Sequence, residues 1–97
     1  MSPMHLARCN FGSFCDKIFK IIYVFGGRSN ETYLDSIEKY SIFFNQWEII
    51  NFILPQQISH FSFTQTNSNS VVIIGGKNTD YQNDIYEINF KEKKINQ

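Results

Sequence analysis

The chain repeats itself once, and this repeat limits its fold more than any other feature. Residues 22–27 read IYVFGG and residues 71–76 read VVIIGG, so two glycine pairs stand 49 residues apart. At the same offset, three upstream residues have matches: Phe14 with Phe63, Phe11 with His60, and Arg8 with Gln57. Downstream, residues 36–41 align with residues 84–89 at an offset of 48. A period near 50 residues is typical of a small set of repeat architectures.

Each repeat unit is predicted to form four short strands. The runs are rich in Tyr, Phe, Ile and Val, and Gly, Asn, Asp and Ser fill the gaps between them. The expected strands are residues 10–15, 18–25, 35–42 and 46–53 in the first unit and 59–66, 70–74, 83–90 and 93–96 in the second. No segment has the apolar period of a helix. The pattern therefore predicts an all-β chain of two four-stranded antiparallel units, over residues 8–54 and 55–97.

Charge and hydropathy exclude several classes of partner. Nine basic and nine acidic residues give a net charge of zero, which argues against nucleic acid or an acidic membrane as a ligand. The longest nearly apolar stretch, residues 18–25, is interrupted by Lys20 and is too short to cross a bilayer. The first residues contain no apolar run of the kind found in a secretory signal. We expect a soluble, intracellular and cytoplasmic protein that binds neither nucleic acid nor membranes.

The sequence contains no arrangement of residues that indicates catalysis. The glycine pairs lack the Lys-Ser/Thr of a phosphate-binding loop, and no nucleophile has a suitably spaced base. Cys9 and Cys15 are expected to be buried or half-buried free thiols, and His60 a packed or channel-facing ring. Solvated positions or turn caps are expected for the carboxylates, namely Asp35, Glu38, Glu48, Asp84 and Glu87. We therefore expect no enzyme activity, no cofactor and no metal.

The repeat resembles the kelch repeat, in which an apolar strand ends in Gly-Gly and is followed by a Tyr and then a Trp. The first unit supplies the full pattern with Gly26, Gly27, Tyr40 and Trp47. The second supplies Gly75 and Gly76, but Ile88 and Ile95 replace the two aromatic residues, so this unit is interpreted as degenerate or truncated. The resemblance implies that each unit is one blade of a β-propeller, as in the superfamily that includes galactose oxidase. Two blades would form an incomplete propeller with apolar faces left exposed.

The resemblance also implies a protein-binding module whose partner contacts the loops between strands. Arg8 and Arg28 are the only arginines, and both are expected on this face, where they would favour a carboxylate or phosphate. The candidate partner-binding residues are Arg8, Arg28, Asn30, Tyr33, Lys77, Asn78 and Tyr81.

Two alternatives to this function remain open. The chain could be a structural unit that completes a propeller by self-association through its blade faces. It could also be a fragment of a kelch-type propeller enzyme. The copper radical oxidases that resemble galactose oxidase need Tyr, His and Cys ligands from several blades, and neither unit supplies that set.

Overall fold

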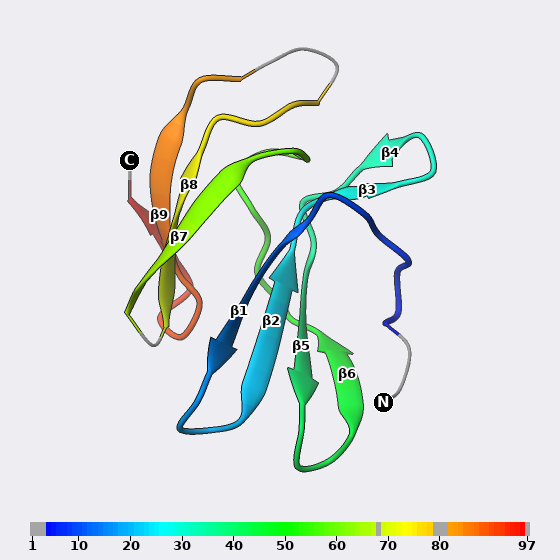
Figure 1. The fold of residues 1–97 in the computed structure, drawn as a ribbon, viewed down its shortest axis with the longest axis vertical. Coiled ribbons are helices and arrows are strands. Elements are labelled where there is room, and N and C mark those ends of the chain that lie inside the picture. Colours follow the sequence, from blue (N-terminus) through cyan, green and yellow to red (C-terminus); the bar gives the residue numbers. More distant parts are fainter. Residues whose placement is uncertain (1–3, 68, 79–81, 97) are drawn as a thin grey trace.

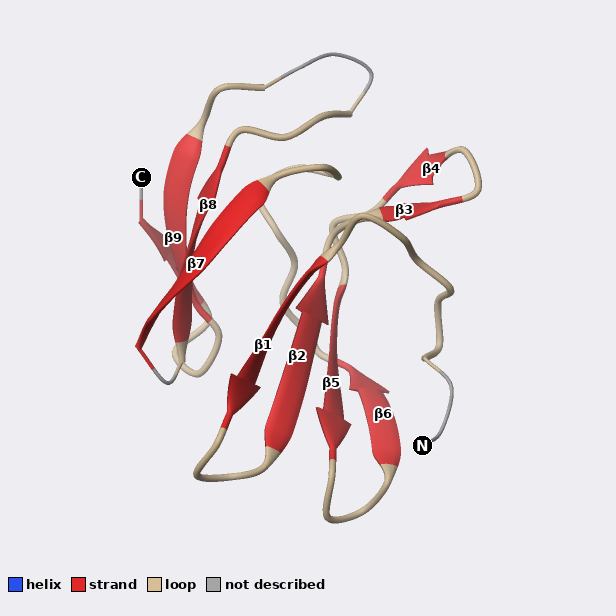
Figure 2. Cartoon of the chain, viewed as in Figure 1, coloured by secondary structure: helices blue, strands red, loops and turns tan. Residues whose placement is uncertain are grey.

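The structure is a computed structural model that describes residues 4–67, 69–78 and 82–96, and all its regular secondary structure in these ranges is β (Figures 1 and 2). The strands are β1 (Gly12–Asp16), β2 (Ile21–Phe25), β3 (Arg28–Ser29), β4 (Thr32–Tyr33), β5 (Ile37–Ser41), β6 (Gln46–Ile49), β7 (Ser62–Asn67), β8 (Ser70–Ile74), β9 (Ile85–Asn89) and β10 (Lys94–Asn96). The first sheet has the order β1-β2-β5-β6 and the second β10-β9-β8-β7, and all pairings are antiparallel. The predicted all-β, antiparallel fold is confirmed.

The β3–β4 hairpin was not predicted. It lies in the loop after Gly27, where Arg28 pairs with Tyr33 and Ser29 with Thr32. Two-residue strands in a polar loop leave no alternating apolar pattern from which they could be recognised.

The last two strands of each sheet pair in the same register. Tyr40 of β5 faces Trp47 of β6, and Ile88 of β9 faces Ile95 of β10. The substitution of two isoleucines for the aromatic pair therefore takes place at equivalent points of the two sheets.

The pairing of the segments that precede β1 and β7 shows that the predicted alignment of the two units is wrong by one residue there. Isolated bridges join Cys9 to Arg28 and Ser59 to Lys77. Since Arg28 and Lys77 each follow a glycine pair, Cys9 is equivalent to Ser59, at an offset of 50 rather than 49. All three upstream matches, Phe14 with Phe63, Phe11 with His60 and Arg8 with Gln57, are therefore wrong by one position. The structural counterpart of Arg8 is Ile58.

Aromatic rings hold the two sheets together. Phe90, in the turn after β9, lies with its ring centroid 4.9 Å from Phe14, 5.3 Å from Tyr23 and 5.3 Å from Phe25. Phe14 and Tyr23 are cross-strand neighbours whose rings stack at 4.8 Å. The buried core that surrounds them consists of Phe14, Tyr23, Phe25, Ile37, Leu54, Ile58, Val71, Ile73, Tyr86, Ile88 and Phe90. One face of the first sheet thus packs against one face of the second.

The connections separate into two ends of the molecule. We call the end that carries the loops after both glycine pairs the Gly-Gly end, and the opposite end the hairpin-turn end (Figure 1). The hairpin-turn end includes the β1–β2 turn (17–20), the β5–β6 turn (42–45) and the β9–β10 turn (90–93). The described segments contain no helix long and apolar enough to cross a bilayer.

Candidate interaction site at the Gly-Gly end

Gly26 and Gly27 place the loop that follows β2. Both have positive φ, 66° and 95°, which a residue with a side chain rarely adopts. A Cβ on Gly27 would lie 2.7 Å from the carbonyl oxygen of Cys9, so the backbone there has no room for one. The amide of Gly27 donates to the carbonyl of Ile58 at 2.8 Å, which ties this loop to the segment that enters the second sheet.

The β3–β4 hairpin presents three of the predicted binding residues. The Arg28 amide and carbonyl both pair with Cys9 at 2.9 Å, and the Arg28 guanidinium carbon lies 5.5 Å from the centre of the Tyr33 ring. This distance fits a cation–π contact. Asn30 is exposed at the tip of the hairpin, with a φ of 55° that suits an asparagine in a tight turn.

A hollow of about 300 Å³ opens beside this hairpin. It is lined by Ala7, Arg8, Cys9, Arg28, Ser29 and Asn30. The Arg28 Nε is buried and makes no hydrogen bond to any described residue. A guanidinium has five N–H donors in a fork that matches a carboxylate, so the arginine that lines this hollow suits an anionic group.

Tyr40 and Trp47 face each other on β5 and β6 of the first sheet. Their ring centroids lie 5.1 Å apart across the β5–β6 pair, and the Tyr40 hydroxyl donates to Oδ1 of Asn45 in the turn between the two strands.

Residues 20–51, which run from the end of the β1–β2 turn through β6, match the family profile of the kelch motif. These residues form a kelch motif. No curated protein matches the chain. The matched kelch repeat contains Gly26, Gly27 and the Tyr40–Trp47 pair, which are the residues that carry the resemblance in the first unit.

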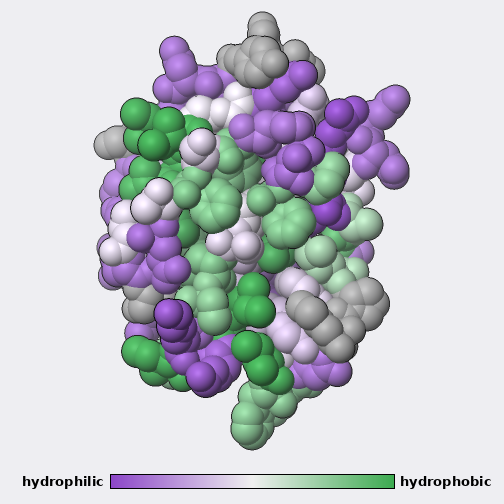
Figure 3. All heavy atoms as spheres, viewed as in Figure 1, coloured by the Kyte–Doolittle hydropathy of each residue, from purple (hydrophilic) through white to green (hydrophobic). Residues whose placement is uncertain are grey.

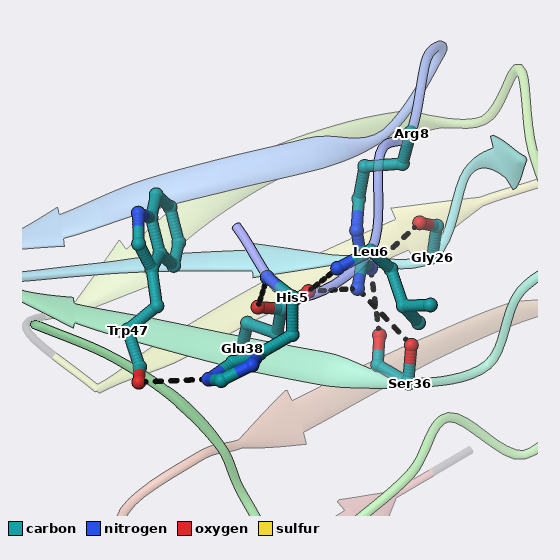
Figure 4. Close-up of polar contacts among 7 residues, drawn as sticks. All are labelled: His5, Leu6, Arg8, Gly26, Ser36, Glu38 and Trp47. Carbon is teal, nitrogen blue, oxygen red and sulfur yellow. Dashed lines mark hydrogen bonds and ion pairs between the residues drawn. The ribbon is translucent and has the colours of Figure 1, made fainter. Parts of the chain in front are cut away.

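Arg8 lies at the entrance to this kelch repeat, with its guanidinium bound inside the chain (Figure 4). Its Nη2 lies 2.8 Å from Oε2 of Glu38, and neither side chain is exposed. Nη1 donates to the carbonyls of Gly26 at 3.0 Å and Ser36 at 3.1 Å, and Nη2 also donates to Ser36 Oγ at 3.1 Å. We predicted that this guanidinium would contact a partner. In the structure it connects the N-terminal segment to Glu38 of β5.

Glu38 corrects a further prediction. It was expected at a solvated position or as a turn cap, but it lies fully buried in β5. Besides Arg8, its carboxylate accepts hydrogen bonds from the amides of His5 at 2.8 Å and Leu6 at 3.2 Å. Glu38 is buried because residues 4–8 cross the face of the first sheet on which it lies, as Figure 4 shows. A charge so buried needs the ion pair and these donors to compensate its lost hydration.

The equivalent loop of the second sheet contributes Lys77 and Asn78. Lys77 exchanges backbone hydrogen bonds with Ser59 at 2.7 and 2.8 Å, and Gln82 Nε2 donates to Oδ1 of Asn78 at 3.0 Å. Both Lys77 and Asn78 are half-buried. Tyr81, the remaining predicted binding residue, lies outside the described residues.

The thiols and histidines differ in part from expectation. Cys15 is half-buried as predicted, whereas Cys9 is exposed. His60 is exposed, so the packed alternative is wrong and the channel-facing one stays a prediction. Its Nδ1 lies 2.7 Å from Ser59 Oγ. Among the described residues, no group of three or more His, Cys, Asp or Glu side chains could hold a metal.

Two tyrosines of the core have perturbed acidities. Burial, with a smaller contribution from Asp16, raises the pKa of Tyr23. Burial also raises the pKa of Tyr86 to about 12. Both shifts come mainly from loss of hydration in the packed core, so they report on folding rather than on a reactive site.

Proposed function

We propose that this kelch-repeat chain is a protein-binding module with no enzyme activity, and that its partner binds at the Gly-Gly end. The observation that carries the proposal is the Arg28 guanidinium, which borders an open hollow with a buried Nε that no described residue uses. An acidic side chain of the partner would supply the missing acceptor. Tyr33 stacks against the guanidinium and Asn30 projects from the same hairpin, which gives an aromatic anchor beside polar groups.

We further propose that the second sheet is a second, degenerate kelch repeat. The two repeats would span residues 8–54 and 55–97 and form two blades of an incomplete propeller. The shared strand order and the equivalent pairs Tyr40–Trp47 and Ile88–Ile95 support this assignment. A matching hydrogen bond also supports it. The amide of the first glycine in each pair donates to the carbonyl of the residue before the next long strand, Gly26 to Ser36 and Gly75 to Asp84.

Selection from a displayed random-peptide library tests the binding proposal. The immobilised chain should enrich peptides that contain Asp or Glu. Calorimetric titration of those peptides should show binding about tenfold weaker for Arg28→Gln, which keeps a polar side chain but removes the charge and the fork.

Lys17→Gln is the matched control, because it removes one positive charge from the hairpin-turn end and should leave peptide affinity unchanged. Enrichment of peptides without acidic residues, or equal affinity for Arg28→Gln and the unmodified chain, would contradict the proposal.

A second candidate function is self-assembly through the outer face of the second sheet. Ile74 and Ile85, which are cross-strand neighbours, are 49% and 60% exposed. Their counterparts in the first sheet, Phe25 and Ile37, are fully buried, and Phe25 packs against the second sheet. The second sheet therefore exposes the face that the first sheet uses for packing, and a second copy of the chain could cover it.

Size-exclusion chromatography with light scattering tests this candidate. Self-assembly predicts a homogeneous oligomer that Ile85→Asp converts to a monomer. A monomer at all concentrations for the unmodified chain would exclude it.

A further inference from the structure

The hairpin-turn end carries apolar side chains that project into solvent. Phe43 and Phe44 in the β5–β6 turn are 84% and 72% exposed, and Ile18 and Phe19 in the β1–β2 turn are 76% and 64% exposed. Hydrophobic side chains stand out at the lower edge of the space-filling view (Figure 3). Large exposed apolar side chains gathered at one end of a small protein indicate an interaction surface for a protein or a membrane.

We call the exposed apolar side chains of these two turns the apolar tip and define it as Ile18, Phe19, Ile42, Phe43 and Phe44. The Ile42 amide donates to the carbonyl of Lys20 at 3.0 Å, so the two turns are in direct contact. The rings of Phe43 and Phe44 meet edge to face, with centroids 5.1 Å apart.

The fold itself does not require these apolar residues. The β9–β10 turn of the second sheet occupies the equivalent position and has the same backbone form. Asn45 and Lys93 both have positive φ, 52° and 57°, and the Phe90 amide donates to Asn69 as that of Ile42 does to Lys20. Yet Lys91 and Glu92 stand where the first sheet has Phe43 and Phe44. A polar turn therefore serves this geometry equally well, and the phenylalanines need another explanation.

Positive charge gathers at the same end. Five of the seven lysines of the chain lie in or directly beside these turns, all of them exposed: Lys17, Lys20, Lys91, Lys93 and Lys94. None of the five forms an ion pair with another described residue. Lys91 and Lys93 also line a hollow of about 390 Å³ between the sheets, together with Lys39 and its ion-pair partner Glu48. The zero net charge, from which we expected no membrane partner, is an average that conceals this cationic end.

We propose that the hairpin-turn end docks onto an anionic lipid bilayer surface. The side chains of the apolar tip would enter the headgroup region, and the surrounding lysines would meet the lipid phosphates. Phenylalanine rings can bury in the apolar part of the membrane interface, and lysines combine an apolar stem with a charge that is attracted to anionic headgroups. The projecting shape of the tip favours a soft bilayer over a protein surface, which would need a complementary cavity for each ring.

Vesicle co-sedimentation of the 97-residue chain tests the proposal. Vesicles of phosphatidylcholine with phosphatidylserine should bind the chain more tightly than vesicles of phosphatidylcholine alone, and added salt should weaken that binding. The double variant Phe43→Ser/Phe44→Ser should bind these vesicles at least about tenfold more weakly than the unmodified chain. The charge variant Lys91→Gln/Lys93→Gln/Lys94→Gln should lose about as much.

Ile53→Ser is the control, because Ile53 is also an exposed apolar residue, at 54%, but lies in the segment between the sheets. It should bind as the unmodified chain does. Absence of vesicle binding, or binding unaffected by the double Phe variant, would overturn the proposal. So would light scattering that shows the double Phe variant dissolving an oligomer without any vesicle binding, since the tip would then be an interface between proteins.

Discussion

Arg8 and Glu38 form an ion pair with Nη2 and Oε2 2.8 Å apart, and both side chains are fully buried. The pair links the segment before the kelch repeat to the third strand of its sheet. At the equivalent positions of the second sheet stand Ile58 and Tyr86, which are both buried in the core. The same architecture is therefore built once around an ion pair and once around apolar side chains.

This comparison predicts a double-mutant result. Glu38→Gln leaves the Arg8 charge buried without its partner, and we expect it to lower the free energy of unfolding by about 3 kcal/mol. Arg8→Ile/Glu38→Tyr introduces the pair of the second sheet and removes both charges, so it should cost less than Glu38→Gln alone. Urea unfolding of the unmodified chain, Glu38→Gln, the double variant and its two single variants, Arg8→Ile and Glu38→Tyr, measures these differences. A double variant as unstable as the sum of its two single variants would show that the sites are independent.

Phe90 should control the packing of the two sheets. It contacts Phe14, Tyr23 and Phe25 of the opposite sheet, so Phe90→Ala opens a cavity between the sheets and should cost about 3–5 kcal/mol. Phe44→Ala removes the same ring from an exposed turn and should change stability by less than about 0.5 kcal/mol. Thermal unfolding of both variants gives the comparison. Similar losses from the two would contradict the packing described here.

Gly27 and Gly75 are predicted to respond unequally to replacement by alanine. At Gly27, φ is 95° and a Cβ would lie 2.7 Å from a backbone oxygen of Cys9. At Gly75, φ is 67° and the nearest atom to a Cβ is a backbone oxygen of Gln82 at 3.2 Å. Gly75→Ala should therefore cost about 1–2 kcal/mol from backbone strain alone, and Gly27→Ala more. Chemical denaturation of both variants tests the order, and a larger loss for Gly75→Ala would reverse it.

Tyr86 predicts a loss of stability in alkali. Its folded pKa of about 12 is higher than the value near 10 expected in the unfolded chain, so the folded state holds the proton more tightly. The resulting stability is complete below about pH 10 and is lost as pH rises toward 12, by about 2 kcal/mol. Tyr86→Phe should flatten this part of the pH profile of unfolding. An unchanged slope between pH 10 and 12 would mean that other groups cause it.

Much of the fold could be predicted from the repeat. Apolar runs and glycine pairs located all eight strands of the two main sheets, because these strands are long enough to show a pattern. The facing of Tyr40 and Trp47 follows from their spacing around the turn at Asn45. The β3–β4 hairpin was missed because its strands are too short for any periodic signal.

The site was predicted less well, because an arginine looks the same in sequence whether it binds a partner or a buried carboxylate. One signal was present. With the offset corrected to 50, Arg8 aligns with Ile58, and Glu38 already aligned with Tyr86. Two opposite charges at positions that are apolar or aromatic in the other unit indicate a compensating pair. The one-residue error at the first strand concealed this relationship.

Nuclear magnetic resonance of the labelled chain during titration with a selected acidic peptide tests the central claim, that a partner binds at the Gly-Gly end beside Arg28, most directly. We predict shifts of the amides of Arg28, Ser29, Asn30 and Tyr33 and of the Arg28 Nε–H, with the turn at Phe43 and Phe44 unchanged. Shifts confined to the hairpin-turn end, or none at saturating peptide, would contradict the claim.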